Sequence, residues 1–185
     1  MKAVKEKWTE LGPLKLEDII VKIILAIILI SIINFSAYSD QNDPQLEILF
    51  NNLLQIETET KARPTISKIW SIWSTALDKK VQAKFDIGNK LMEKRQFEES
   101  IDIFSEVINL QPNFAEAWNK RATVNYIIGN YDNSISDIFS TLDLEPRHFG
   151  ALDGLAQIYF NQDKYFEAAQ IYRKILKISS SVYGF

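Results

Sequence analysis

The chain has 185 residues, of which 46% are apolar and 24% are charged, and its formal net charge is −3. That balance is typical of a folded protein rather than a disordered one, and the absence of a recurring basic cluster argues against nucleic-acid binding. Because there is no cysteine, disulfides, thiol catalysis, sulfur-bound metals and a lipoprotein anchor are excluded.

The N-terminal segment has the pattern of an export signal. Residues 19–33 read IIVKIILAIILISII, and several lysines precede them. The apolar core after Lys22 is about as long as the apolar region of a signal peptide, and it is short for a bilayer span of roughly 20 residues. The small residues of the following AYSD predict cleavage after Ser39, which makes residues 1–39 a signal peptide. The alternative is an uncleaved anchor that meets the membrane only through residues 19–35.

The next segment is predicted to form two helices. DPQLEILFNNLL begins with Asp43 as a helix N-cap and Pro44 in the first turn. Pro64 then opens PTISKIWSIWSTAL, in which two tryptophans share an apolar helical face. We therefore predict that residues 40–80 form a helix pair that caps the first of the units following it, with both tryptophans in the core.

The rest of the chain repeats with a period of 34 residues, and a fixed period of this size indicates a repeat architecture. Three segments align without a gap: 81–114, 115–148 and 149–182. Positions of one kind recur in them: small residues at Gly88, Ala122 and Ala156 and at Ser100, Ser134 and Ala168, aromatic residues at Phe97, Tyr131 and Tyr165, and prolines at Pro112 and Pro146. Each segment contains two helical patterns joined by a short polar turn, so each is predicted to be an antiparallel helix pair.

This pattern resembles the tetratricopeptide repeat over residues 81–182. AEAWNKRATVNY and EPRHFGALDGLAQIY further resemble a set of alphaproteobacterial periplasmic proteins built from this repeat. The resemblance implies an all-α solenoid of three helix pairs preceded by the capping pair, with residues 183–185 as a tail. It also implies a periplasmic location, with attachment to the inner membrane if the N-terminal helix is retained.

The last helix, expected at about 166–178, is followed only by a short tail. Solenoids usually end in a polar capping helix, which is missing here. The apolar residues Ile171, Ile175 and Ile178 are therefore expected to be covered either by Val182, Tyr183 and Phe185 folding back or by a partner. An exposed apolar face often marks an interface. One reading is thus a structural subunit that forms homo-oligomers through these three isoleucines.

No constellation for catalysis is visible. The chain has one histidine and no cysteine, no glycine-rich phosphate loop and no acidic cluster with calcium-loop spacing, so we expect no enzyme activity, no cofactor and no metal site. The favoured function is instead a non-catalytic scaffold that binds a protein or peptide in the concave groove lined by the first helix of each repeat. By helical phase the groove residues are Phe85, Asn89, Met92, Asn119, Thr123, Tyr126, Asp153, Gln157 and Phe160.

Chaperone-binding members of the family use a clamp of basic residues to hold the C-terminal carboxylate of their ligand. This sequence does not match that clamp. Only Asn89 matches that clamp. Phe85, Gly150 and Gly154 stand where basic residues are needed, so this binding mode is not expected here.

Two residues of opposite charge fall on the packing faces of the second repeat. Arg121 and Asp137 stand where the other two repeats have apolar residues. An isolated buried charge is costly, whereas a hydrogen-bonded pair is tolerated. We predict a bidentate ion pair between them, joined by Asn125 and with His148 nearby, and we take Glu106 as the second choice of partner for Arg121.

The segment EPRHFGAL crosses the joint between the second and third repeats. His148 is the one side chain of the sequence that normally titrates near neutrality. We expect a structural role there, in which His148 and Arg147 bond to free carbonyls at the helix ends.

Overall fold

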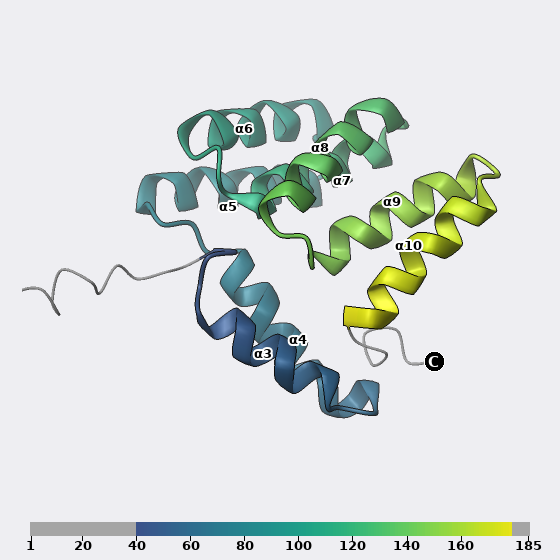
Figure 1. The fold of residues 1–185 in the computed structure, drawn as a ribbon. Coiled ribbons are helices and arrows are strands. Elements are labelled where there is room, and N and C mark those ends of the chain that lie inside the picture. The colour runs from purple at the N-terminus through teal and green to yellow at the C-terminus, as the bar shows by residue number, and fades with distance from the viewer. Residues whose placement is uncertain (1–39, 179–185) are drawn as a thin grey trace, which may run out of the picture. The chain divides into compact units, whose positions relative to one another are not determined.

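The computed structural model describes residues 40–178, which lie in the second of two compact units, Met1–Ala37 and Tyr38–Phe185. The predicted signal peptide or anchor and the tail at 183–185 lie outside the described residues. Every regular element in the described range is a helix: α3 (Gln45–Leu54), α4 (Glu59–Trp73), α5 (Lys79–Glu93), α6 (Phe97–Leu110), α7 (Ala115–Ile127), α8 (Tyr131–Leu144), α9 (Phe149–Asn161) and α10 (Tyr165–Ile178) (Figure 1).

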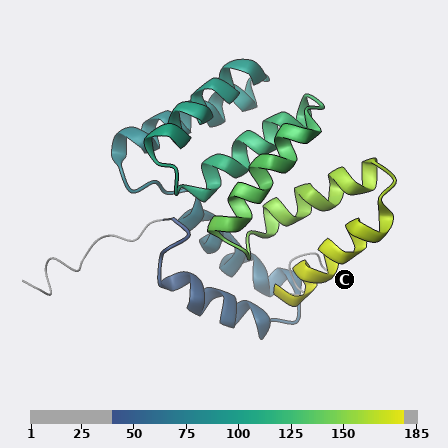
Figure 2. The same ribbon diagram turned by 45° about the horizontal axis from the view of Figure 1, so that its top comes forward.

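The three repeats form three successive helix pairs, α5–α6, α7–α8 and α9–α10, which lie side by side (Figure 2). The predicted all-α solenoid of three pairs with a further pair in front is confirmed. Small residues let the helices of a pair approach: a Cβ added to Gly88 would lie 2.7 Å from Phe104 Cε1. The Ser100 hydroxyl donates to the Gly88 carbonyl at 2.9 Å, and its repeat equivalent Ser134 donates to the Ala122 carbonyl at 2.8 Å.

Helix α4 begins earlier than the sequence predicted. It starts at Glu59, and Pro64 lies inside it rather than at its first turn. A proline inside a helix removes one backbone hydrogen bond. The extra turn is nevertheless formed, since Ala62 within it is fully buried and Arg63 pairs with Glu59 at 2.9 Å. Helix α3 begins one residue later than predicted, with Pro44 rather than Asp43 at the N-cap position. The Asp43 carboxylate still accepts a hydrogen bond from the backbone N–H of Gln45 at 2.8 Å.

The N-terminal helix pair packs against the third repeat, so the prediction that it caps the first repeat is wrong. Trp73 lies 5.0 Å from Phe149 between ring centroids, and Trp70 lies 5.2 Å from the same ring. One continuous core joins α3 and α4 to the end of the solenoid and contains Leu46, Leu49, Phe50, Leu53, Ile69, Trp73, Phe149, Leu152, Leu155, Ile171 and Ile175. The first repeat belongs to a different core around Phe85, Phe104 and Phe114.

This docking also corrects the prediction for the last helix. Ile171 is 9% exposed, Ile175 is fully buried and Ile178 is half-buried against the same core. Helix α3 contacts α10, and Figure 2 shows the end of α10 next to the N-terminal helix pair. The three isoleucines are therefore part of the protein's own core, and the predicted homo-oligomer interface through them is wrong.

The close packing of Trp70 on α9 gives a test of this arrangement. A Cβ added to Gly150 would lie 2.5 Å from the Trp70 ring, whereas one added to Gly154 would meet Ile138 at an ordinary 3.6 Å. Alanine is favoured over glycine inside a helix by up to about 1 kcal/mol, and overpacking costs about 1–3 kcal/mol. We expect Gly150→Ala to be less stable than Gly154→Ala by about 1–3 kcal/mol in denaturant unfolding. Equal stabilities would show that Trp70 does not pack there.

Within residues 40–178, no helix is both long enough and apolar enough to cross a membrane.

Candidate functional site

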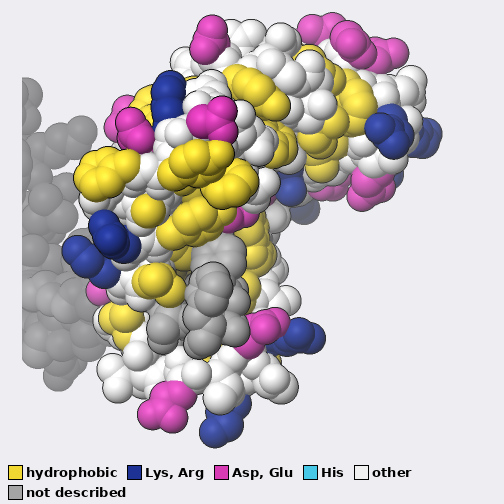
Figure 3. Space-filling model, turned by 90° about the vertical axis from the view of Figure 1, so that its right-hand side faces the viewer, with side chains coloured by type: hydrophobic (Ala, Val, Ile, Leu, Met, Phe, Trp, Pro, Cys, Tyr) yellow, Lys and Arg dark blue, Asp and Glu magenta, His cyan; other side chains and the backbone are white. Residues whose placement is uncertain are grey.

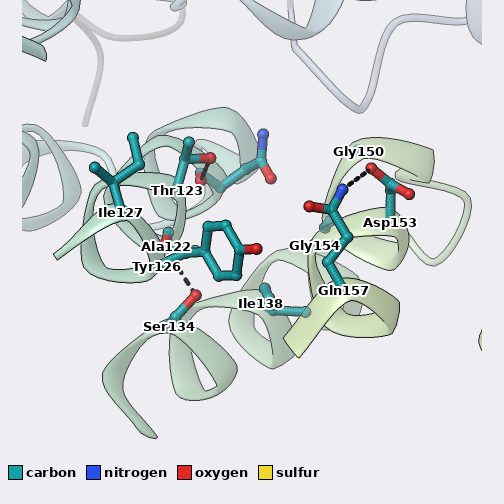
Figure 4. A pocket seen from close by; sticks show the side chains of 12 residues that line it. Ala122, Thr123, Tyr126, Ile127, Ser134, Ile138, Gly150, Asp153, Gly154 and Gln157 are labelled. Atoms are coloured by element: carbon teal, nitrogen blue, oxygen red, sulfur yellow. Dashed lines mark hydrogen bonds between the residues drawn. The ribbon is translucent and has the colours of Figure 1, made fainter. Parts of the chain in front are cut away.

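A hollow of about 290 Å³ opens between the first helices of the second and third repeats. Its walls come from α7 and α9, and two residues of α8 form part of its lining (Figure 4). The lining consists of Asn119, Ala122, Thr123, Tyr126, Ile127, Ser134, Ile138, Gly150, Ala151, Asp153, Gly154 and Gln157.

Five of the nine predicted groove residues lie together in this hollow: Asn119, Thr123, Tyr126, Asp153 and Gln157. The other four do not line it. Phe85 is buried in the core of the first repeat, while Asn89 and Met92 are half-buried on α5. Phe160 is 57% exposed and packs edge-on against Tyr165. A ligand-binding role for any of the nine stays a prediction.

A buried acid–imidazole pair lies directly behind the hollow, and the sequence did not predict it. Glu116 and His148 are both fully buried, with His148 Nε2 2.9 Å from Glu116 Oε2. The Ala151 amide donates to His148 Nδ1 at 3.1 Å, so Nδ1 carries no proton and Nε2–H donates to the carboxylate. The same Glu116 oxygen accepts from the Asn119 amide at 3.0 Å, which joins the pair to the wall of the hollow.

This pair holds two repeats in register. Glu116 lies in the first turn of α7, and His148 is the N-cap of α9. The Trp73 ring stacks on the imidazole at 4.2 Å between centroids. The prediction that His148 lies near the Arg121–Asp137 pair is therefore wrong. Its ring contacts Glu116 of α7 and Trp73 of the N-terminal helix pair instead.

The pKa of Glu116 lies below its ordinary value of 4.5. Burial favours the neutral acid, but the hydrogen bond from His148, the charge of Lys120 at 3.4 Å and the Asn119 amide together outweigh it. A group with a lowered folded-state pKa stabilises the protein above its unfolded value, and that stability is lost as the pH falls through the folded value.

We therefore expect the stability difference between wild type and Glu116→Gln to be full above pH 4.5 and to shrink as the pH falls further. Denaturant titrations of both proteins from neutral to acid pH measure it. A difference that stays constant down through the acid range would contradict the assignment.

The predicted ion pair of the second repeat is present and bidentate. Arg121 Nη2 donates to Asp137 Oδ1 at 2.7 Å, and Arg121 Nε donates to Asp137 Oδ2 at 2.9 Å. Asn125 also donates to Asp137, at 3.4 Å. Arg121 Nη1 further donates to the Ser105 hydroxyl at 2.9 Å, so the network extends into the first repeat. Glu106, the second choice of partner, pairs with Lys84 instead.

Arg147 bonds to carboxylates rather than to the predicted helix-end carbonyls. It forms ion pairs with Glu145 at 3.0 Å and with Glu47 of α3 at 2.9 Å. Its guanidinium also lies over the Phe50 ring, 4.2 Å from the centroid. The joint between the second and third repeats is therefore also an attachment point for the N-terminal helix pair.

Apolar side chains gather on the side of the molecule where α9 and α10 lie (Figure 3). Phe160, Tyr165, Phe166 and Leu176 are all exposed there. No group of three or more histidine and acidic side chains within residues 40–178 is placed to hold a metal ion.

The fold and the hollow between its inner helices define a tetratricopeptide-repeat solenoid. Residues 150–181 match the family model described as Tetratricopeptide repeat. A TPR repeat-containing protein of Rhizobium etli is 37% identical over 117 residues, which cover 63% of this chain and 57% of that protein. Small glutamine-rich tetratricopeptide repeat-containing protein 2 of Saccharomyces cerevisiae is 28% identical over 69% of this chain and 32% of that protein.

Solved structures show the same fold. A crystal structure of MamA superposes with a TM-score of 0.52 at 20% identity, covering 65% of this chain and 68% of that one. The crystal structure of the Sgt2 TPR domain from Aspergillus fumigatus also superposes with a TM-score of 0.52. It is 18% identical and covers 55% of this chain and 67% of that one. This chain is thus similar to tetratricopeptide-repeat proteins and has their solenoid fold, which is typical of protein–protein interaction scaffolds. It spans 57% and 32% of the lengths of the two curated relatives.

Proposed function

We propose that the protein is a non-catalytic scaffold that binds an extended segment of a partner protein in the hollow between α7 and α9. The observation that carries the proposal is the hollow itself, in which polar and aromatic side chains from two repeats converge. Sites of this kind combine apolar walls with a few placed polar groups. At about 290 Å³ the hollow suits one side chain of a peptide whose backbone runs along the groove.

The site is held in place before a ligand arrives. The Glu116–His148 hydrogen bond fixes the start of α9 against α7, and the Asn119 amide is held by the same carboxylate. A preorganised site loses less conformational entropy on binding. The buried pair therefore supports binding by keeping the two walls at a fixed separation.

Peptide selection on the immobilised protein tests the proposal. Peptides recovered from a random library are measured by fluorescence polarisation against wild type and against a Tyr126→Ala/Gln157→Ala double variant, which removes two side chains from the hollow. We expect the double variant to bind at least tenfold more weakly. Phe139→Ala is the matched control, because it removes an exposed ring of α8 that does not line the hollow. Equal binding by wild type and the double variant would defeat the proposal.

We also propose that the scaffold works in the periplasm, supported by the apolar segment and the AYSD sequence of the N-terminus. The mature protein is expected to begin at Asp40. Intact mass of protein recovered from the periplasm decides this, and a full-length chain in the membrane fraction would support the anchor instead.

A further inference from the structure

We propose that the hollow between α7 and α9 accepts a basic side chain, a lysine ammonium or an arginine guanidinium, from the bound peptide. This inference rests on the proposed function and names the chemical class of its ligand. It follows from which polar atoms of the hollow remain free, and from their charge.

Each side-chain amide of the hollow already donates one of its two N–H groups within the protein. The Asn119 side-chain amide donates a hydrogen bond to Glu116 at 3.0 Å, and the Gln157 side-chain amide donates one to Asp153 at 2.5 Å. The hydroxyls of Thr123 and Ser134 donate to the carbonyls of Asn119 and Ala122 at 2.9 and 2.8 Å. The donors left for a ligand are the second N–H of each amide and the O–H of Tyr126, whose oxygen accepts from the Asn161 amide.

The hollow also has free acceptors. The Asn119 carbonyl oxygen has no hydrogen-bond partner within residues 40–178, although the residue is only 6% exposed. Gln157 is oriented in the same way: its amide points to Asp153, while its carbonyl oxygen points toward the Tyr126 ring (Figure 4). An ammonium or guanidinium brings only donors, so it complements these two oxygens.

The charge of the hollow also favours a cationic ligand. Asp153 is the one charged side chain in its lining, and it forms no ion pair within residues 40–178. The negative charge of Asp153 also acts on neighbouring groups. The pKa of Tyr172 lies above its ordinary value of 10.0, mainly because the phenol is partly buried and next because Asp153 is close to it. A cation is attracted to this charge, while a carboxylate or phosphate is repelled.

The helix start nearby does not reverse this preference. The N-terminus of a helix normally favours anions through its free amides. At α9, however, the Ala151 amide donates to His148 Nδ1, and the carboxylate of Glu116 lies on the other side of that ring. The negative charge and the free carbonyl oxygens therefore dominate at the hollow.

The remaining walls suit the stem of a long basic side chain. Ala122, Ile127 and Ile138 provide apolar surface, and the Tyr126 ring also lines the hollow (Figure 4). Lysine and arginine bury their methylene stems against such surfaces, and an aromatic ring face attracts their charged groups. Each part of a basic side chain thus has a matching part of the hollow.

The test uses the peptides selected on the wild-type protein. Each is resynthesised with its lysines replaced by norleucine and its arginines by citrulline, which removes the charge and retains the stem. We expect the selected peptides to share a basic residue, and its neutralisation to weaken binding to wild type about tenfold. In Asp153→Asn, the original peptides should bind about tenfold more weakly, and neutralisation should then have little effect. Asp143→Asn, which removes an exposed charge of α8 outside the hollow, should behave like wild type.

Two different failures are distinguishable. If peptides bind and the Tyr126→Ala/Gln157→Ala variant loses them, but neutralisation or Asp153→Asn changes affinity less than twofold, the preference for a basic side chain is wrong and the scaffold function stands. If the double variant binds every peptide as wild type does, the hollow is not the binding site, and both proposals fall.

Discussion

Replacing Trp73 with alanine is expected to lower the free energy of unfolding by about 3–5 kcal/mol, the usual cost of removing a large buried aromatic side chain. Trp73 is 1% exposed, stacks on His148 and packs against Phe50 and Phe149. It therefore joins the N-terminal helix pair to the third repeat, and its removal opens a cavity between them. Denaturant unfolding followed by far-UV circular dichroism measures the loss.

Two further variants sharpen this expectation. Trp73→Phe should cost clearly less than Trp73→Ala, because a ring still fills the site and the Trp73 indole N–H, which is buried without a hydrogen-bond partner in the described range, is removed. Leu54→Ala truncates an exposed side chain of the same helix pair and should change stability by less than about 1 kcal/mol. If Trp73→Ala were as mild as Leu54→Ala, the helix pair would not be docked as described.

Removing either member of the Arg121–Asp137 pair is expected to cost about 3 kcal/mol, the lower end of the range for buried ion pairs. The lower end applies because the Arg121 side chain is 21% exposed, whereas that of Asp137 is only 6% exposed. Arg121→Leu leaves a carboxylate in the core with only Asn125 as its side-chain donor. Replacing both residues by the apolar types that the other repeats carry should restore most of the lost stability.

A double-mutant cycle of Arg121→Leu and Asp137→Ile measures this coupling in denaturant. Its sign is informative: the double variant should be more stable than either single variant. Losses that simply add would show that the two charges act independently, despite the bidentate geometry.

Some features of the molecule can be read from the chain itself. The 34-residue period fixes the three helix pairs, since each recurring small residue marks a close approach of two helices. The Arg121–Asp137 pair was also predictable, because two opposite charges replace apolar residues on packing faces within one repeat. Helical phase alone brought Asn119, Tyr126 and Gln157 to one surface, where the structure has the hollow.

Other features were decided by the tertiary structure alone. The apolar faces of the N-terminal helices show that they must be buried but not against which surface, because hydrophobic burial is non-directional. The structure places them on the third repeat, where Trp70 meets Gly150 and Trp73 meets His148. This contact also covers the final helix, for which the sequence left the covering surface open.

The buried Glu116–His148 pair gave no sequence signal either. A glutamate in the first turn of a helix ordinarily reads as a surface residue that favours the helix dipole, and nothing in the repeat pattern relates it to a histidine in the loop before the third repeat. The two become fully buried partners only when that loop folds back over α7 and Trp73 closes over the imidazole. Period and helical phase are local properties, so the chain determines its repeats by itself, whereas contacts between surfaces far apart in the sequence depend on how the packed helices come together.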